Sequence, residues 1–390
     1  MLEKLGKRAL VLPFGMAIIL CCILSLAVGP MLRAEPNNVP FGVVNLDTEA
    51  VTATGQTNVG ETLTSKLVSG ESSLTGSSDE TSGSTSNMAD AISWTQLESE
   101  KEATAALDNN ELYGAIVIPS NFTTQQINSQ MGQGNAPQIT VYLNKGKNPQ
   151  MASSMQTTIE NALLQAGIAC EVKVVNDTDI GGGSMSSTMA VQMMAMPLFL
   201  LTIICSLLLS MLFWKNDITG LRGKNTALTV IALLVFTAAL SALAAGSALF
   251  ICTVAGGMTL PAADLFLFLW FASGCCMLCF TALCCLSFPL GAFIAVGTFA
   301  LGMSCAMLGP EMLPQLWADW VYPWAPQAHI GNGIRSIIYL GHTPSTSETY
   351  PLLAFGIVGA AVLALAAILE SAKKETAPQP QIASRKQSPN

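Results

Sequence analysis

Clustered cysteines are the residues of this sequence whose chemistry is easiest to recognise. They are Cys275, Cys276, Cys279, Cys284 and Cys285. Thiolates of this kind hold soft metal ions, but the spacing fits no closed zinc pattern, and no His or acidic residue lies among them. Free cysteine is also at home as a small apolar residue in a packed helix. We therefore expect a structural role for the cluster, without a metal or any other cofactor.

The sequence lacks the residues that nucleotide binding and hydrolase activity require. A phosphate-binding loop has the pattern Gly-x-x-x-x-Gly-Lys-[Ser/Thr]. The segment Gly220–Asn225 contains a Gly-Lys pair, but it lacks a second Gly at the needed spacing and has Asn where the hydroxyl belongs. A Ser-His or Cys-His relay is impossible in residues 33–188, which contain no His. We expect His329 and His342 to be structural, and the protein to be no enzyme.

Apolar stretches dominate the 390 residues, of which 51% are hydrophobic and 11% charged. A transmembrane helix needs about 20 apolar residues. Six stretches suit this role: Ala9–Leu32, Met189–Phe213, Thr226–Val254, Leu265–Leu286, Leu290–Leu308 and Pro351–Leu369. Residues 9–32 are too long for the apolar region of a signal peptide, so we expect a retained first span. The other five lie within residues 189–370, and the fold class is a polytopic α-helical membrane protein with six spans.

The basic residues predict the orientation. Ten of the 17 Lys and Arg residues lie in residues 1–8, 214–225 and 371–390. By the positive-inside rule these segments, including both termini, face the cytoplasm. We expect an interfacial segment at residues 1–8 and a disordered tail at 371–390. Residues 33–188 and 309–350 are then extracellular, and the protein is predicted to lie in a bacterial plasma membrane.

Residues 33–188 are predicted to form a small extracellular α/β domain between spans one and two. Residues 34–188 hold 17 acidic and 5 basic residues, which argues against nucleic acid as a partner. Helical patterns cover Glu98–Asn109, with a capping box at Thr95–Glu98, and Asn148–Ala169, which we expect to run on toward the second span. Residues 69–90 are poor in apolar side chains and predict a mobile loop. Alternating apolar residues predict strands at Phe41–Asn45, Leu112–Ile118 and Ile139–Leu143, with a weaker one at Ala91–Trp94.

The order of these elements and several short motifs resemble a known family. The segment Val39–Asp47 follows the first span, and Gly60–Leu63 follows the first strand. Tyr113–Phe122 ends in an Ile-Pro-x-x-Phe turn, and Pro326–Arg335 is a Pro…Arg segment before the last span. Together they resemble the phage-infection-protein-like branch of the type-2 ABC exporter permeases. The resemblance implies a separate ABC ATPase subunit and a second permease chain, as homodimer or similar heterodimer.

The cytoplasmic segment 214–225 is the expected docking point for the ATPase. In the family that it resembles, a short helix between the second and third spans inserts into a groove on the ATPase. The alternative is a basic loop that only fixes topology. A loop that only fixes topology needs basic residues and has no use for Asp217, Ile218 and Leu221, so we favour coupling to the ATPase. The candidate residues are Asn216, Asp217, Ile218, Thr219, Leu221 and Arg222.

The outer segment 309–350 is rich in aromatic residues, which collect at the headgroup level of a membrane. We expect Trp317, Trp320, Trp324 and Arg335 to form an outer-leaflet interface with membrane lipids. Arg335 lies in an apolar helix, where an arginine must snorkel or find a partner. Asp319 and Glu311 are the candidate partners for an ion pair, and an acidic lipid is a further one.

We therefore expect the permease subunit of an ABC exporter for a lipid-like or amphipathic substrate. The spans carry no ionisable residue except Asp264 at an edge, which argues against an ion-coupled carrier and favours an apolar path. The alternative is a membrane-anchored receptor or secretion accessory protein with no transport activity.

Overall fold

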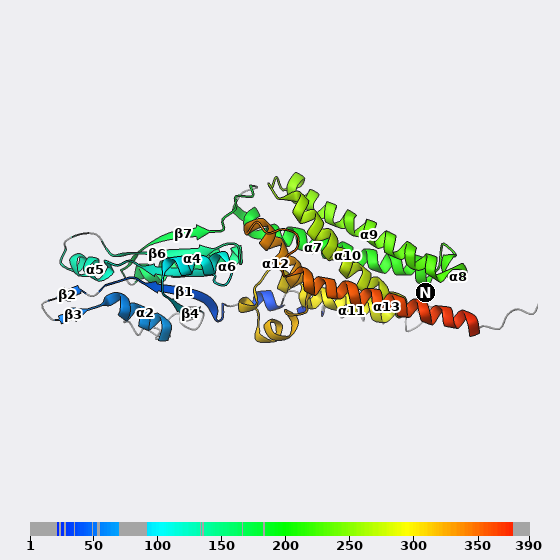
Figure 1. Cartoon of the computed structure of the whole chain (residues 1–390), viewed down its shortest axis with the longest axis horizontal. Helices are drawn as coiled ribbons and strands as arrows, with labels where there is room; N and C mark the ends of the chain where they lie inside the picture. The colour runs from blue at the N-terminus through cyan, green and yellow to red at the C-terminus, as the bar shows by residue number, and fades with distance from the viewer. Residues whose placement is uncertain are drawn as a thin grey trace, which may run out of the picture.

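The computed structural model of the protein describes residues 22, 25, 26, 29–34, 36–48, 50–52, 55–69, 92–132, 134, 136–165, 167–181 and 184–376. A sheet with its helices lies at one end, and a bundle of long helices extends away from it (Figure 1). The predicted interfacial segment 1–8 and most of the predicted span 9–32 lie outside the described residues. So do residues 70–90 of the predicted mobile loop and 377–390 of the predicted tail.

The sheet has five strands in the order β4-β1-β5-β6-β7. Strand β1 is parallel to β4 and β5, β5 and β6 are antiparallel, and β6 is parallel to β7. A separate ladder pairs two short strands, β2 (Ala50–Thr52) and β3 (Gly55–Thr57). The strands of the main sheet are β1 (Val39–Asn45), β4 (Ile92–Leu97), β5 (Gly114–Ile118), β6 (Gln138–Asn144) and β7 (Ala169–Val175).

Alternation along the strands gives the sheet two buried faces. Phe41 and Val43 of β1 pack with α2 (Val59–Ser69) and α6 (Pro149–Gln165) in one cluster. Val44 packs with α4 (Glu100–Asp108) in a second cluster. Helix α5 (Phe122–Gln130) adds Phe122 to the first cluster. The helical pattern predicted from Asn148 is confirmed over α6, whose apolar residues Met151, Met155, Ile159 and Leu163 are all buried there.

Two helix boundaries differ from the predictions. Strand β4 runs through Leu97, so the helix begins later and its N-cap is Ser99. The Ser99 hydroxyl accepts a hydrogen bond from the Glu102 N–H, and the Glu102 carboxylate accepts one from the Glu98 N–H. Helix α6 ends at Gln165, because Gly167 adopts a φ of 69° and the chain turns into β7. The prediction that this helix runs on toward the second span is therefore wrong.

Among the residues that the structure describes, four helical segments are long and apolar enough to cross a membrane: Met189–Lys215, Thr226–Ala255, Ala262–Leu286 and Thr349–Lys374. They correspond to the helices α7 (Ser184–Leu209), α9 (Thr226–Phe250), α10 (Ala262–Leu286) and α13 (Thr349–Thr376), with short π-helical turns after α7 and α9. A tight turn separates the predicted spans Leu265–Leu286 and Leu290–Leu308, since α10 ends at Leu286 and α11 (Phe288–Gly302) begins directly after Ser287.

The predicted span Leu290–Leu308 is shorter in the structure. Helix α11 ends at Gly302 and spans about 22 Å, less than the hydrocarbon core of about 30 Å. The chain continues in a short 3-10 turn at Ser304–Ala306. Helix α12 (Pro326–Tyr339) packs closely against this region, because a Cβ at Gly331 would lie 2.4 Å from the Ala306 carbonyl oxygen. Helix α11 therefore ends where α12 crosses the chain.

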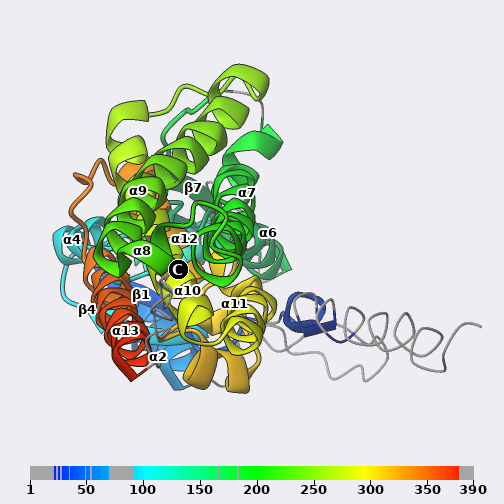
Figure 2. The ribbon, with the colours of Figure 1, turned by 90° about the vertical axis from the view of Figure 1, so that its right-hand side faces the viewer.

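Helix α10 is the centre of the bundle, surrounded by α7, α9, α11 and α13 (Figure 2). Glycines of α13 allow the closest approach. A Cβ at Gly356 would lie 2.9 Å from the Cys275 sulfur, and one at Gly359 would lie 2.6 Å from the Cys279 nitrogen. The clustered cysteines thus supply small side chains where two helices nearly touch, which supports their structural interpretation.

Candidate functional site

The segment 214–225 lies at the end of the bundle farthest from the sheet, beside the C-terminal part of α13 (Figure 1). We call it the connector, since it joins α7 to α9. A π-helical turn (Ser210–Lys215) leads into it, and α8 (Leu221–Lys224) closes it. Positive φ angles at Asp217 (43°) and Gly220 (64°) reverse the chain between the two. Glycine adopts this conformation readily, whereas Asp217 needs compensating contacts.

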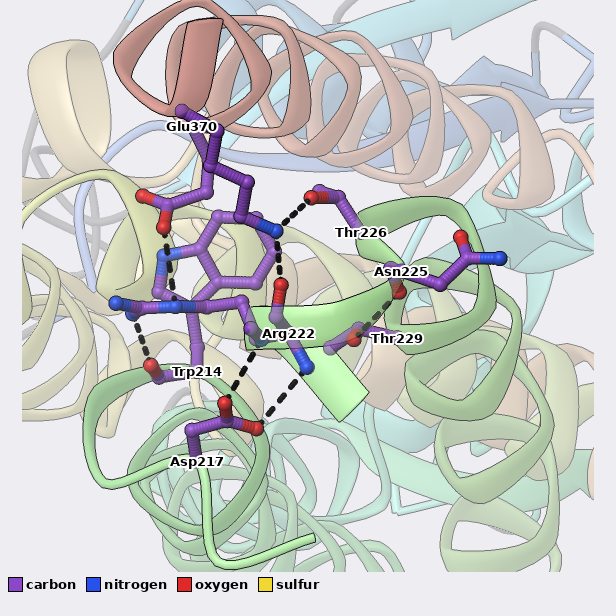
Figure 3. A network of polar contacts seen from close by, with 9 residues as sticks. Trp214, Asp217, Arg222, Asn225, Thr226, Thr229 and Glu370 are labelled. Carbon is purple, nitrogen blue, oxygen red and sulfur yellow. Dashed lines mark hydrogen bonds and ion pairs between the residues drawn. The ribbon is translucent and has the colours of Figure 1, made fainter. Parts of the chain in front are cut away.

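Asp217 receives those contacts from backbone N–H groups of α8 (Figure 3). Its carboxylate accepts hydrogen bonds from the Arg222 N–H at 3.0 Å and the Gly223 N–H at 2.9 Å. The Gly223 bond is the largest cause of a lowered pKa of Asp217, opposed by loss of hydration and reinforced by the Arg222 N–H and by the charges of Arg222 and Lys374. Asp217 therefore caps α8 and fixes the turn.

Arg222 and Lys374 tie the connector to the last helix (Figure 3). The Arg222 Nε lies 3.3 Å from the Glu370 carboxylate, and its Nη1 donates to the Trp214 carbonyl oxygen. The guanidinium carbon is 5.7 Å from the centroid of the Trp214 ring. Lys374 donates to the Arg222 carbonyl oxygen and, at 2.8 Å, to the Thr226 hydroxyl. These contacts join the connector directly to α13.

Asn225 defines where α9 begins. Its side-chain oxygen accepts a hydrogen bond from the Leu228 N–H at 3.1 Å, and its backbone carbonyl accepts from the Thr229 hydroxyl at 3.2 Å. This N-cap satisfies an amide that the first helical turn leaves without a partner. The connector is thus held at both of its ends and at α13.

The six predicted coupling residues differ in what they contact and how far they are exposed. Asp217 and Arg222 point into the network that holds the connector. Ile218 points outward with 67% of its surface exposed, and its neighbours Asn216 and Thr219 are also exposed. Leu221 is half-buried.

Three members of the network, Trp214, Glu370 and Lys374, were not predicted as site residues. The signal that could have found two of them is the i, i+4 spacing of Glu370 and Lys374 on one helix face.

The predicted outer-leaflet residues also divide. Trp320 and Trp324 are exposed. Trp317 is half-buried and donates its indole N–H to the Leu301 carbonyl oxygen at 3.0 Å. Trp317 begins a π-helical turn (Trp317–Val321), which follows a short 3-10 turn (Pro310–Met312). The longest helix of the segment 309–350 is α12. Trp317 therefore packs part of its ring against the protein.

Arg335 is the clearest departure from the predictions. Only 3% of its surface is exposed, and its guanidinium donates to the Ala306 carbonyl oxygen at 3.2 Å and to the Asn332 side chain. None of the ion pairs within the described residues involves Arg335, so the predicted pair with Asp319 or Glu311 is wrong. It does not snorkel either, because α12 is buried between the sheet and the bundle.

The two histidines have different surroundings. His329 contacts the Glu348 carboxylate through Nδ1 at 2.6 Å, as expected of a structural residue. His342 is exposed. Among the described residues, no group of three or more His, Cys, Asp or Glu side chains is placed to hold a metal ion.

A comparison with curated proteins and with solved structures gives no match. Against known families, residues 7–369 match the family described as ABC-2 family transporter protein. This match includes the sheet, the connector and the long apolar helices. The chain therefore belongs to the ABC-2 family of transporter proteins, and is the membrane subunit of an ABC transporter, which works with an ATPase subunit.

Proposed function

We propose that the protein is the permease of an ABC exporter and that its ATPase subunit docks on the connector. The observation that carries this proposal is the exposure of Ile218 at the tip of a turn that Asp217 and Arg222 hold in place. An apolar side chain on a rigid, basic turn is suited to fill a pocket on a partner. Movement of that partner would reach α13 through Glu370 and Lys374.

The proposed topology has six spans, formed by residues 9–32, the four long helices and α11 with the turn that follows it. Its support is the arrangement of charge along the molecule. The connector and the basic end of α13 lie together at one end, and the acidic sheet domain lies at the other (Figure 1). The positive-inside rule then places the connector and both termini in the cytoplasm and the sheet domain outside the cell membrane.

The proposed substrate is lipid-like or amphipathic, and the proposed assembly contains a second permease chain. Six spans make half of a transporter, so the path would run between two copies of this chain or two similar chains. The bundle presents exposed apolar side chains along α9, including Ile231, Val235 and Leu243. An uncharged surface of this kind suits a partner helix or an apolar substrate better than a small ion. Trp320 and Trp324 are proposed to meet the lipids of the outer leaflet.

Substitution of Ile218 tests the docking. The variant Ile218→Asp places a charge where an apolar contact is proposed, so co-purification of the ATPase and transport of the substrate should each fall about tenfold or more. The matched control is Leu164→Asp on α6, because Leu164 is likewise an exposed aliphatic residue but lies in the sheet domain. It should leave both measurements unchanged.

The opposite result would contradict the proposal. If Ile218→Asp keeps its ATPase and its transport rate while remaining folded, the connector is not the docking point. If the wild-type chain shows no transport at all but still binds a secreted or phage-borne protein, the receptor function replaces the exporter function.

A further inference from the structure

A polar cavity lies at the junction of the sheet domain and the segment 309–350, far from the connector. Its volume is about 340 Å³, near the lower end of the range for small-molecule sites. Two of its lining residues, Asn109 and His342, are exposed, so it opens to solvent. Most small-molecule pockets are lined predominantly by apolar side chains, whereas charged and amide groups line this one. Such a lining suits a small, charged ligand.

Within the part of the chain that the structure describes, two opposite charges in the cavity form no close ion pair. Arg335 is almost fully buried and lines the cavity, and Glu311 lines it too. Within the described residues, Arg335 has no carboxylate within 4.0 Å and Glu311 has no basic group within 4.0 Å. The two groups therefore form no direct ion pair, although they share one cavity; the Glu311 charge acts on Lys147, whose pKa it raises against the larger effect of burial. A buried charge without a counter-charge is costly, which favours a ligand that supplies one.

The walls around these charges are fixed. The Tyr113 hydroxyl donates to Glu311 at 2.8 Å, and burial, followed by the nearby Glu311 charge, raises the pKa of Tyr113. A Cβ at Gly309 would lie 2.5 Å from the Tyr113 oxygen, so only glycine fits there. On the other side, the Tyr322 hydroxyl and Arg335 both donate to the Asn332 side-chain oxygen. Both charged groups are thus held in place before any ligand arrives.

We propose that this cavity binds a small zwitterion, with its acid group on Arg335 and its ammonium group on Glu311. The acid group is a carboxylate or a phosphate, joined to the ammonium by a short linker. Guanidinium recognises either acid through paired N–H donors. Lys147 lines the same cavity with its Nζ 4.7 Å from the centroid of the Tyr113 ring, and adds positive charge. This site does not depend on ATPase docking at the connector.

Two sources share this ligand chemistry: free amino acids, and the phosphoethanolamine headgroup of a phospholipid. Calorimetric titration of the purified full-length chain with glycine and with phosphoethanolamine tests the class directly. Ethanolamine and acetate, each carrying one of the two charges, are the comparison probes. At least one zwitterion should bind about tenfold or more tightly than either single-charge probe, since each charged contact contributes.

Variants locate the ligand in the cavity. Glu311→Gln keeps an acceptor for Tyr113 but removes the charge, and should weaken zwitterion binding about tenfold or more without affecting acetate. Arg335→Lys should weaken binding of both. The control Asp319→Asn removes an exposed carboxylate of the same outer segment that does not line the cavity, and should change nothing.

Each outcome decides the proposal. Zwitterion binding that is lost in Glu311→Gln and kept in Asp319→Asn supports it. Absence of zwitterion binding, equal binding of acetate, or binding unchanged by Glu311→Gln overturns it, even if Arg335→Lys fails to fold. Nanodiscs then separate the sources. If phosphatidylethanolamine blocks the titration and phosphatidylglycerol does not, the ligand is the lipid headgroup. If neither blocks it, the ligand is soluble.

Discussion

At the scale of single residues, the connector depends on charged side chains that serve the fold rather than a partner. Asp217 caps α8, and Arg222 reaches back to Trp214 and across to Glu370. Both residues are named easily from the sequence, because charges stand out between apolar spans. The orientation of Arg222 is not, since it depends on Glu370 of a helix 148 residues away in sequence. Among the six candidates, Ile218 is therefore the exposed apolar residue that is left for an external contact, beside the exposed polar residues Asn216 and Thr219.

The pair of Arg222 and Glu370 should contribute measurably to stability. Their side chains are 27% and 18% exposed, so the coupling should lie between surface and buried ion pairs, at about 1 kcal/mol. A double-mutant cycle of Arg222→Gln and Glu370→Gln, followed by thermal unfolding in detergent, measures it. The more exposed pair of Lys145 and Asp177 is the control and should couple more weakly. Equal coupling in the two cycles would contradict the role of the connector pair.

The cap formed by Asp217 should depend on pH. Its folded-state pKa is lowered, so its stabilising contribution is present above the unfolded pKa of about 4 and is lost as the pH falls through the folded value. Hydrogen exchange at the Arg222 and Gly223 amides, corrected for intrinsic rates, should show protection lost on acidification. Asp217→Asn has no such titration and should remove this step. The same pH profile in both proteins would show that another group is responsible.

At the scale of elements, local patterns predicted those parts of the fold that local chemistry decides. Alternating apolar residues located β1, β5 and β6, and a helical pattern located α6. Strand β7 was missed although Val172 and Val174 alternate with Glu171 and Lys173, because the helix predicted at Asn148–Ala169 was expected to run on through this segment. The shortened α11 could not be predicted, because the crossing of α12 is a tertiary contact.

The contact between α10 and α13 should be sensitive to small additions. In Gly359→Ala the new Cβ would meet the Cys279 backbone at 2.6 Å, which forces the helices apart. Overpacking of this kind costs about 1–3 kcal/mol and should lower the Tm by about 2–6 °C. Gly297→Ala on α11 is the matched control, because nothing lies within 4 Å of its added Cβ. Equal Tm values for the two variants would contradict the close approach.

At the scale of the whole molecule, function follows from two ends that do different things. The connector and the end of α13 lie at one end, and the sheet domain lies at the other (Figure 1). The cavity lies between them, where the sheet domain meets the segment 309–350. Charge and span length predicted this polarity from the sequence. The cavity could not be predicted, because Tyr113, Glu311 and Arg335 come together only when the sheet packs against α12. Long-range packing of this kind leaves no periodic signal in a sequence.

The most direct test of the central claim is a photo-crosslinker placed at Ile218 in the native cell membrane. Docking of the ATPase on the connector predicts a crosslink from position 218 to an ATP-binding-cassette protein, and none from the same group at Leu164 in the sheet domain. A crosslink from Leu164 alone, or none from position 218 in an actively transporting membrane, would contradict the claim that energy enters through the connector.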